Sequence, residues 1–521
     1  MKKIILISLI FISLIYSNKL FSNPADTVNI YHYEIFLDLH DITVPSIKGN
    51  CIISLNPQID NLKSIKLDLL SLNVDSLKIN NLRSDSYSYN RKNIDINFDK
   101  GFNRTDSVSI NIYYHGSPVI DISNFGGFYF TDNYAFNLGV GLKANPPGFG
   151  RAWFPCIDDF RIKSTYDFHI KTSTKNKAIC NGLLVSIDNN YVDNTNTYHW
   201  KINRLITSYL ASVAVGNYTS INDTLNGKLN KIPVNIFVKP SDSANAVKSF
   251  VNLKSALNIF ENLFGPYKWE RIGYVGVPFT DGAMEHASNI AIPESLINGT
   301  INNEHVFYHE LSHHWFGDLV TCAMPEDMWL NEGWATYCES LFSEYLYGNK
   351  AFKDYQRGIH HISIQLSGII DSSVFPVFNP PQNYTYGVTT YYKGNDVVHS
   401  LRNYIGDSLF FSTIRSYMKD YSYKNISTDQ FRKYFENKTN INLKDFFDNW
   451  LYTAGFPHFS TDSFTVNPNG KKYDITVFFR QKLSRRNFFS NSNKIEVSFM
   501  DKSWNIYKDT ATISGEYSSK K

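Results

Sequence analysis

The stretch HELSH at residues 309–313, followed by NEGWA at residues 331–335, decides the fold of the central part of this chain. On a helix, His309 and His313 lie one turn apart, so both imidazoles can reach one Zn²⁺ at about 2.0–2.1 Å. Glu310 lies beside them, where it can act on an attacking water. A catalytic zinc site needs one more protein ligand. Glu332 follows His313 by 19 positions, a gap that suits a second helix beside the first.

The H-E-x-x-H pattern is weak evidence when it stands alone. With 14 His in 521 residues, the pattern arises by chance in roughly one or two of every hundred chains of this composition. Histidines on one helix face also occur in ordinary cores and on surfaces. The local pattern does predict a helix that stops near Gly317, with one stripe formed by Val306, His309, His313 and Phe316.

Strand-like alternation fills the N-terminal side of the chain, from about residue 28 to 220. Asn, Asp, Ser and Gly cluster between the alternating runs, as they do in hairpins and loops. The region is therefore predicted to be a β-sheet domain that ends near Gly216. Two runs alternate apolar with polar side chains, which is typical of half-buried strands: Tyr33, Ile35, Leu37 and Leu39, and then Val108, Ile110, Ile112 and Tyr114.

The period changes to that of a helix after Ser243. Large apolar side chains recur at steps of three and four until Gly265-Pro266, which predicts one amphipathic helix: Phe250, Leu253, Leu257, Phe260 and Phe264. Helical patterns continue to about residue 450, and alternation returns over residues 473–479 and 495–499. We therefore predict a multidomain α+β protein with an N-terminal β-sheet or sandwich domain (23–220), a mixed α/β domain (221–457) and a short C-terminal β module (458–521).

Residues 1–22 are typical of a secretory signal peptide. Lys2 and Lys3 precede an apolar run over residues 4–16, and Ser17 or Ser22 stands just before a possible cleavage site. The 13 residues of this run are too few to cross about 30 Å of hydrocarbon as a helix, so a retained membrane anchor is the weaker interpretation. We predict an exported protein, in a periplasm, outside the cell or at its surface.

Charge and cysteine content exclude further classes. The chain has 51 basic and 48 acidic residues, a formal net charge of +3, which is too small for a polybasic nucleic-acid surface. Residues 1–22 hold three Lys and no acid, so their removal would leave a neutral chain. The five Cys are an odd number, which leaves at least one without an intramolecular partner. Their pairing and the oligomeric state cannot be read from the sequence.

Longer motifs around HELSH resemble those of the M1 aminopeptidase family. HELSHHWFGDLV and MWLNEGWATYCE, from 309 and 328, are similar to its zinc-binding core H-E-x-x-H-(x)18-E. GAMEH at 282–286 resembles its exopeptidase motif G-[AG]-M-E-N, and YYKG at 391–394 resembles Y-x-K-G. RAWFPCID at 151–158 resembles a motif of its N-terminal domain, and WLYTAGFP at 450–457 the end of its catalytic domain.

The resemblance implies a thermolysin-like catalytic domain with one Zn²⁺ per chain, bound by His309, His313 and Glu332. Glu310 would then be the general base, accepting the proton of a water and passing it to the leaving amine. Tyr391, the first position of Y-x-K-G, would donate a hydrogen bond to the developing oxyanion. Tyr386 and Tyr392 are close competitors for that role.

The resemblance also implies a substrate, namely a peptide or polypeptide with a free N-terminus. Glu285 would hold the α-ammonium group and so set cleavage one residue from the end of the chain. Gly282 and Ala283 are small enough for their backbone to lie against an extended peptide, and a pocket beside Met284 would receive the N-terminal side chain.

Several positions depart from the family pattern or stay ambiguous. His286 stands where the family usually has Asn, and residues 144–148 lack the acid that gives many members a second amine contact. Glu339 follows Glu332 by two helical turns, where it would either orient a zinc-binding His or form a surface salt bridge. His314 points about 100° away from His313 on a helix, so we expect a structural role for it.

The sequence leaves two other functions open. Only 64 residues follow Pro457, so we expect the family's helical C-terminal domain to be missing and the cleft to be more open. A relative of leukotriene-type epoxide hydrolases would need basic residues from that domain. A catalytically inactive, peptide-binding M1-like protein would typically have lost a zinc ligand or the general base, and this chain keeps both.

Overall fold

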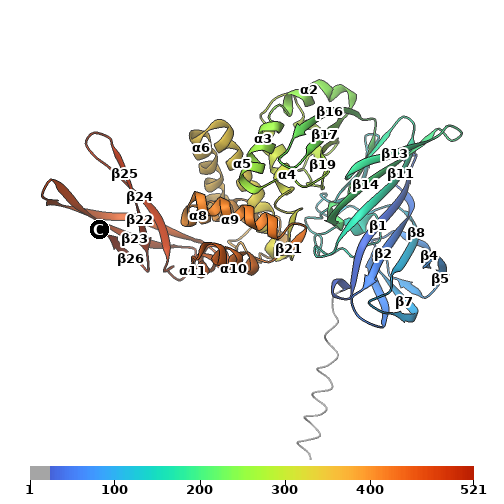
Figure 1. The fold of residues 1–521 in the computed structure, drawn as a ribbon, viewed down its shortest axis with the longest axis horizontal. Coiled ribbons are helices and arrows are strands. Elements are labelled where there is room, and N and C mark those ends of the chain that lie inside the picture. Colours follow the sequence, from blue (N-terminus) through green and yellow to red (C-terminus); the bar gives the residue numbers. More distant parts are fainter. Residues whose placement is uncertain (1–23) are drawn as a thin grey trace, which may run out of the picture. The chain divides into compact units, whose positions relative to one another are not determined.

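The computed structural model describes residues 24–521, so the predicted signal peptide lies outside the described residues. The chain divides into two compact units, one reaching Tyr218 and the other starting at Thr219. The first unit is built of strands, and the second combines helices with strands (Figure 1). The predicted α+β class is confirmed.

An eight-stranded sheet is the main element of the first unit. β1 pairs in parallel with β11 and antiparallel with β2. In spatial order the strands are β13 (Leu183–Asn190), β14 (Thr195–Thr207), β11 (Lys163–Ser173), β1 (Val28–Leu39), β2 (Ile47–Pro57), β8 (Val108–Gly116), β4 (Asn73–Ile79) and β5 (Leu82–Ser84).

The predicted alternation places one face of this sheet in the core. Tyr33 and Ile35 of β1 are fully buried, as are Ile110 and Ile112 of β8. Polar side chains between them, such as Glu34, lie on the other face, which is only partly covered. Two smaller sheets complete the unit. Their strand orders are β3 (Leu62–Asp68), β7 (Asn93–Phe102), β6 (Tyr87–Tyr89), and β12 (Lys177–Cys180), β15 (Val213–Gly216), β10 (Tyr134–Leu138), β9 (Gly127–Thr131).

The second unit begins with a four-stranded sheet, in the order β16 (Thr219–Asn226), β17 (Lys231–Val238), β18 (Ile272–Val277), β19 (Ile290–Pro293). A short pair, β20 (Val320–Cys322) with β21 (Lys424–Ile426), lies further along the chain. The helices are α2 (Ser243–Ser249), α3 (Leu253–Phe264), α4 (Glu304–His313), α5 (Glu332–Tyr347), α6 (Asn349–His361), α7 (Ser367–Ile370), α8 (Gly394–Ile405), α9 (Asp407–Asp420), α10 (Thr428–Thr439) and α11 (Lys444–Trp450).

The apolar stripe after Ser243 forms two helices rather than the single helix that we predicted. α2 ends at Ser249, and α3 begins at Leu253 with Asn252 as its N-cap. Asn competes with helical hydrogen bonds and favours helix ends, which is consistent with a break here. The predicted stop is correct, because α3 ends at Phe264 and Gly265 follows with φ 103°.

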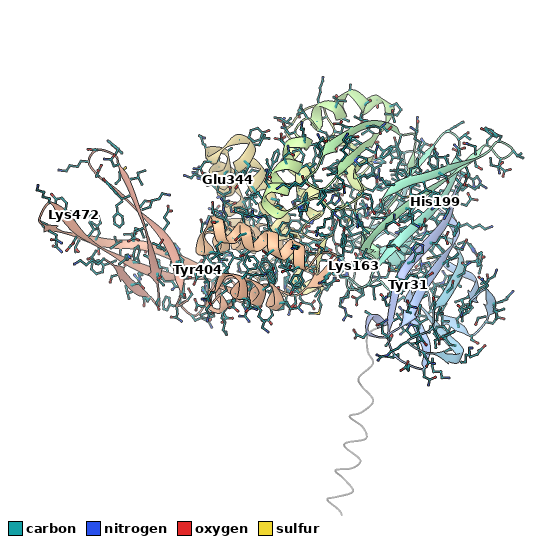
Figure 2. The ribbon with its side chains drawn as sticks, viewed as in Figure 1. Tyr31, Lys163, His199, Glu344, Tyr404 and Lys472 are labelled. Carbon is teal, nitrogen blue, oxygen red and sulfur yellow. The ribbon has the colours of Figure 1, made fainter. Side chains whose placement is uncertain are left out.

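Strands return after α11, as the alternation predicted. β22 (Phe456–Asn469), β23 (Lys472–Ser484) and β26 (Tyr517–Lys520) form one sheet, and β24 (Asn493–Met500) pairs with β25 (Ile506–Ile513). Val477, Phe479, Ala511 and Ile513 form their small core. The Tyr404 side chain of α8, labelled in Figure 2, joins these strands to the helices, since its hydroxyl lies 2.9 Å from Ser492 Oγ.

All five cysteine side chains are buried, and Cys51, Cys156 and Cys338 carry free thiols. Among residues 24–521, no helix combines the length and the apolar character needed to cross a membrane.

Candidate active site

The two histidines of HELSH and Glu332 meet in the interior of the second unit. α4 carries His309 and His313, and α5, which packs against α4, begins with Glu332. The Nε2 atoms of both histidines lie 3.4 Å from Glu332 Oε2. One ligand atom from each of the three side chains lies within 4.8 Å of the others, and all three residues are buried. The structure thus brings together the three side chains that the sequence singled out.

The other nitrogen of each imidazole is held by a hydrogen bond. His309 Nδ1 lies 2.6 Å from Glu339 Oε1, and His313 Nδ1 lies 2.9 Å from the carbonyl oxygen of Phe316. If Nδ1 donates in both contacts, the lone pair of each Nε2 is left facing Glu332. Two imidazoles and a carboxylate with such outer partners are the donor set of a catalytic zinc site. The residues present therefore fit Zn²⁺.

The turn after α4 orients His313. The helix ends at His313, so Phe316 lies in the turn and not in the helix, where the sequence pattern placed it. Gly317 has φ 129°, which is unfavourable for other residues, and a Cβ at this position would lie 3.1 Å from His313 Nδ1. Glycine thus lets the chain fold back closely enough for the Phe316 carbonyl to reach the imidazole.

Close packing of two glycines brings Tyr391 to the cluster. A Cβ on Gly333 of α5 would lie 2.9 Å from the Cα of Gly394, the last residue of YYKG. Tyr391 lies in a π-helical turn, η10 (Thr389–Lys393), directly before α8. π-Helical turns often occur at functional sites. The Tyr391 ring stacks parallel to that of His309, with 6.1 Å between the ring centroids.

The competing tyrosines differ in their surroundings. Tyr386, like Tyr391, is close to the carboxylates of Glu332 and Glu285, and burial together with these charges raises the pKa of both phenols. Both therefore stay protonated and able to donate a hydrogen bond near neutral pH. Tyr392 instead lies near Glu339 and His309.

The segment with Gly282, Ala283, Met284 and Glu285 runs beside β19. Met284 and Ala291 exchange two backbone hydrogen bonds of 2.9 Å, which fixes this segment at the sheet edge. Gly282 is exposed and Ala283 is half-buried, whereas Met284 and Glu285 are buried. Glu285 is close enough to interact electrostatically with His313, Glu332 and His309.

The pKa values of the buried carboxylates in this site shift in opposite directions. Burial raises the pKa of Glu285, and it raises the pKa of Glu310 to about 7 although both histidines oppose the shift. Burial also disfavours ionisation of Glu332, but His313 and His309 outweigh it and lower the pKa of Glu332 to about 2. The ionised form of Glu332 is therefore the one that these histidines stabilise.

Comparisons with known proteins agree with this geometry. Residues 249–450 match the peptidase family M1 domain, and residues 29–210 match the peptidase M1 N-terminal domain. This chain belongs to peptidase family M1. Bovine (Bos taurus) glutamyl aminopeptidase is 27% identical over 339 residues, which cover 62% of this chain and 35% of the relative. Mouse (Mus musculus) aminopeptidase B is 27% identical over 333 residues, covering 60% of this chain and 49% of the relative. The chain thus spans about a third to a half of these curated relatives.

Solved M1 structures share the fold. An M1 zinc metallopeptidase mutant from Deinococcus radiodurans, bound to the substrate Tyr-Ser-Ala, has a TM-score of 0.73 at 20% identity, over 82% of this chain and 97% of that one. Legionella pneumophila aminopeptidase A in complex with aspartic acid has a TM-score of 0.78 at 18% identity, over 95% of this chain and 57% of that one.

Sequence reasoning missed some parts of this M1 site. Tyr355 of α6 donates a hydrogen bond to Glu339, which in turn holds His309, and no local motif marks Tyr355. The role of the Phe316 carbonyl is also invisible, because a backbone atom has no sequence signal. His314 has the structural surroundings that we expected, with its Nδ1 2.9 Å from the Tyr267 hydroxyl and its Nε2 accepting from the Ser288 amide.

Proposed function

We propose that this M1 peptidase is an exported zinc-dependent aminopeptidase that removes residues one at a time from the N-terminus of peptides. The observation that carries the proposal is the meeting of two imidazoles and a carboxylate beside two further buried carboxylates. The family membership supports the same class, since the relatives compared above are aminopeptidases.

His309, His313 and Glu332 would hold one Zn²⁺ per chain. The ion, when bound, would polarise the scissile carbonyl and make a water molecule more acidic. Glu339 and the Phe316 carbonyl would keep the two imidazoles in the orientation that binding requires. Glu332→Ala should therefore lower the zinc content, and full occupancy in that variant would remove Glu332 from the ligand set.

Glu310 would move the proton of the reaction. It follows His309 directly on α4 and is buried, so little bulk water competes for its carboxylate. It would accept a proton from the attacking water and deliver it to the leaving amine. Tyr391, stacked near His309, would donate its hydroxyl proton in a hydrogen bond to the oxygen that becomes negative in the transition state.

Glu285 would make the enzyme an exopeptidase. Its buried carboxylate, close to the histidines, offers a charge partner for the α-ammonium group of a peptide. A buried charge needs such a partner. A peptide without a free amine would leave the Glu285 carboxylate unpaired and would bind poorly. Gly282, Ala283 and Met284 would line the path of the N-terminal residue, because their backbone is held at the edge of β19.

A panel of chromogenic aminoacyl substrates tests the proposal. Hydrolysis should disappear with a zinc chelator and return when Zn²⁺ is added back. N-acetylated versions of the same substrates should be cleaved much more slowly, and Glu285→Ala should impair free-amine substrates most. Full activity in metal-free protein would refute the zinc mechanism, and equal cleavage of acetylated peptides would refute the aminopeptidase assignment.

Export is proposed from residues 1–22 and has its own test. The support is the order of two Lys, an apolar run and small residues at the N-terminus. N-terminal sequencing of protein expressed in its natural host should find a mature chain that starts close after residue 17 or 22. A chain that keeps Met1 inside the cell would refute this part of the proposal alone.

A further inference from the structure

A second group of histidines and a carboxylate lies on the partly covered face of the eight-stranded sheet. β11 has β1 on one side and β14 on the other. The register places Glu34 and Lys201 on either side of Asp167, and Phe36 and His199 on either side of His169. Asp167 and His169 are two residues apart, so they share one face of β11. The opposite face carries the buried side chains of Tyr166, Phe168 and Ile170.

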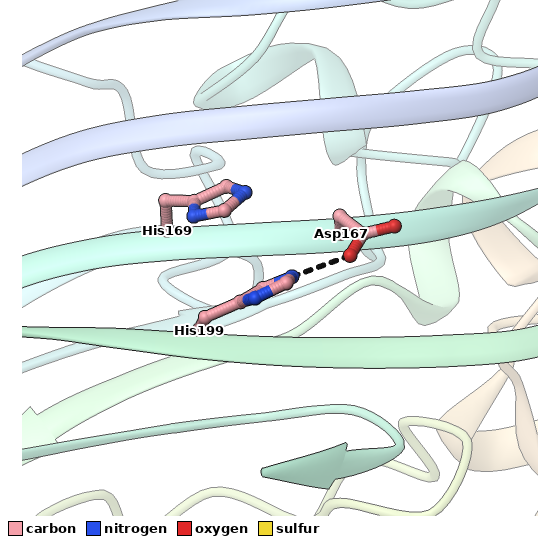
Figure 3. Close-up of side chains that lie close together, drawn as sticks. All are labelled: Asp167, His169 and His199. Atoms are coloured by element: carbon pink, nitrogen blue, oxygen red, sulfur yellow. Dashed lines mark hydrogen bonds and ion pairs between the residues drawn. The ribbon is translucent and has the colours of Figure 1, made fainter. Parts of the chain in front are cut away.

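Three side chains on this face meet closely enough to share a metal ion. His199 Nε2 lies 2.5 Å from Asp167 Oδ1, and the rings of His169 and His199 stack with 4.2 Å between their centroids (Figure 3). One ligand atom from each of the three side chains lies within 4.8 Å of the others. A fourth donor is near, because His32 Nε2 lies 3.4 Å from Asp167 Oδ2.

A salt bridge between neighbouring strands does not need as many groups as surround the Asp167 carboxylate. Lys201 Nζ lies 2.8 Å from Asp167 Oδ2 and already neutralises that carboxylate across the strand pair. The imidazoles of His32 and His199 add two more nitrogens around the same carboxylate. His169 is held from its other side by Glu34, with 3.1 Å between Nε2 and Oε1, as a metal-binding imidazole is often held by an outer carboxylate.

We propose that Asp167, His169 and His199, with His32 as a fourth ligand, bind one divalent ion of the Ni²⁺, Cu²⁺ and Zn²⁺ group. Imidazole with carboxylate is a donor set that suits these ions. Ligand atoms around a tetrahedral ion at about 2.1 Å are roughly 3.4 Å apart. His199 Nε2 and Asp167 Oδ1, now 2.5 Å apart, must therefore separate, and ligand atoms that lie up to 4.8 Å apart must draw together. They can do so, because the side chains of His169 and His199 are each 21% exposed. Lys201, 41% exposed, can turn toward solvent as the ion replaces its charge.

The test counts metal ions in the full-length protein. Purified protein is dialysed against buffered micromolar Zn²⁺, and the bound metal is measured by mass spectrometry. We expect two equivalents in the wild type and one in the double variant His169→Gln, His199→Gln. The matched control is His115→Gln, because His115 forms a simple pair with Asp75 on the same sheet (Nδ1 to Oδ1, 2.7 Å), and this variant should keep two.

A second double variant removes the proposed catalytic site from this metal count. His309→Gln with His313→Gln removes two of its predicted ligands, and this protein should still bind one equivalent. The sheet site is refuted if the His309 and His313 variant binds no metal while the His169 and His199 variant binds as much as the wild type. A wild type with one equivalent that is unchanged in the His169 and His199 variant also refutes it, and leaves the proposed aminopeptidase untouched.

A gain of affinity provides a check that misfolding cannot imitate. Lys201→Met removes the cation that competes for Asp167, so the sheet site should bind Cu²⁺ up to about fivefold more tightly, the factor that a partly exposed ion pair is worth. In the His309→Gln, His313→Gln background, the Cu²⁺ electron paramagnetic resonance spectrum should show at least two coordinated nitrogens. A spectrum without nitrogen coupling, or weaker binding in Lys201→Met, would contradict the proposed ligand set.

Discussion

Two clusters in this chain have the same composition, two histidines and one carboxylate, and differ in nearly everything around them. The cluster on α4 and α5 is buried in helices, whereas the cluster on β11 and β14 lies on a half-covered sheet face. In both, one ligand atom per residue lies within 4.8 Å of the others. Ligand type and spacing alone therefore do not separate a reaction centre from a binding site, and the surroundings must decide.

The surroundings differ in what faces the ligands. His309 and His313 are each held from behind by a buried acceptor, Glu339 or the Phe316 carbonyl. Asp167 of the sheet cluster is instead shared with Lys201, whose charge competes with a metal ion for the same carboxylate. Ligands that are already oriented cost little to order, so we expect the helical cluster to bind its metal more tightly.

The largest expected effect tests the proton-moving carboxylate that only one cluster needs. Glu310→Gln keeps the shape of the side chain and removes its basicity, so kcat should fall by roughly 10²- to 10⁴-fold. Zinc content should stay at the wild-type level, since Glu310 is not among the clustered ligand atoms. Loss of zinc in this variant would show that the role assigned to Glu310 is wrong.

Tyr391→Phe should have the next largest effect. Removing one hydrogen-bond donor to a developing oxyanion costs about 10²- to 10³-fold in kcat. KM should change far less, because the donor acts on the transition state and not on the bound substrate. Tyr386→Phe is the matched control, since Tyr386 lies near the same carboxylates. A larger fall in kcat for Tyr386→Phe would transfer the role to Tyr386.

The histidine pair of the helical cluster and Glu310 could be predicted because their geometry is local. Residues four apart on a helix always lie one turn apart, so the five letters of HELSH were enough to place both imidazoles and Glu310 together. Period-two alternation likewise predicted β1 and β8, whose apolar faces are buried. The break between α2 and α3 and the π-helical turn at Thr389–Lys393 were missed. Both depend on packing against other segments, which local periodicity does not record.

The sheet cluster could not be predicted, because it depends on register between distant strands. Glu34 and His169 are 135 positions apart, and Asp167 and His199 are 32 positions apart. Parallel pairing of β1 with β11 brings the first pair together. A shift of one residue in that pairing would turn these side chains to the opposite face. The apolar alternation of each strand decides which face is buried, but it does not decide which residue of β1 lies opposite Asp167.

Glu339→Gln should have a smaller effect than the first two variants and compares the outer partners of the two clusters. Glu339 Oε1 lies 2.6 Å from His309 Nδ1, and loss of such a partner typically costs 10- to 100-fold in metal affinity, about the range we expect here. Glu34→Gln is the counterpart in the sheet cluster, and its effect on metal affinity should be smaller because the Glu34 side chain is 34% exposed. Zinc affinities measured by competition with a chelator check both values. Equal effects in the two variants would mean that burial does not strengthen the outer contact.

The smallest expected effect is on the free energy of unfolding, and it comes from protonation of the histidines. His286 is fully buried, and burial lowers its pKa from 6.5 to about 3. Between these values the unfolded chain binds a proton that the folded protein excludes, so stability falls as the pH falls below 6.5. At pH 5 the expected loss is about 2 kcal/mol.

His286→Asn should therefore reduce the drop in unfolding free energy between pH 8 and pH 5 by about 2 kcal/mol, a difference that urea titration at both pH values measures. Burial, and to a lesser extent the neighbouring His199, also lowers the pKa of His169 in the sheet cluster. His169→Gln should change the pH dependence in the same direction but less, because a partly exposed imidazole is only partly desolvated. If the two variants changed the slope equally, desolvation would not be what distinguishes the buried histidine from the one on the sheet.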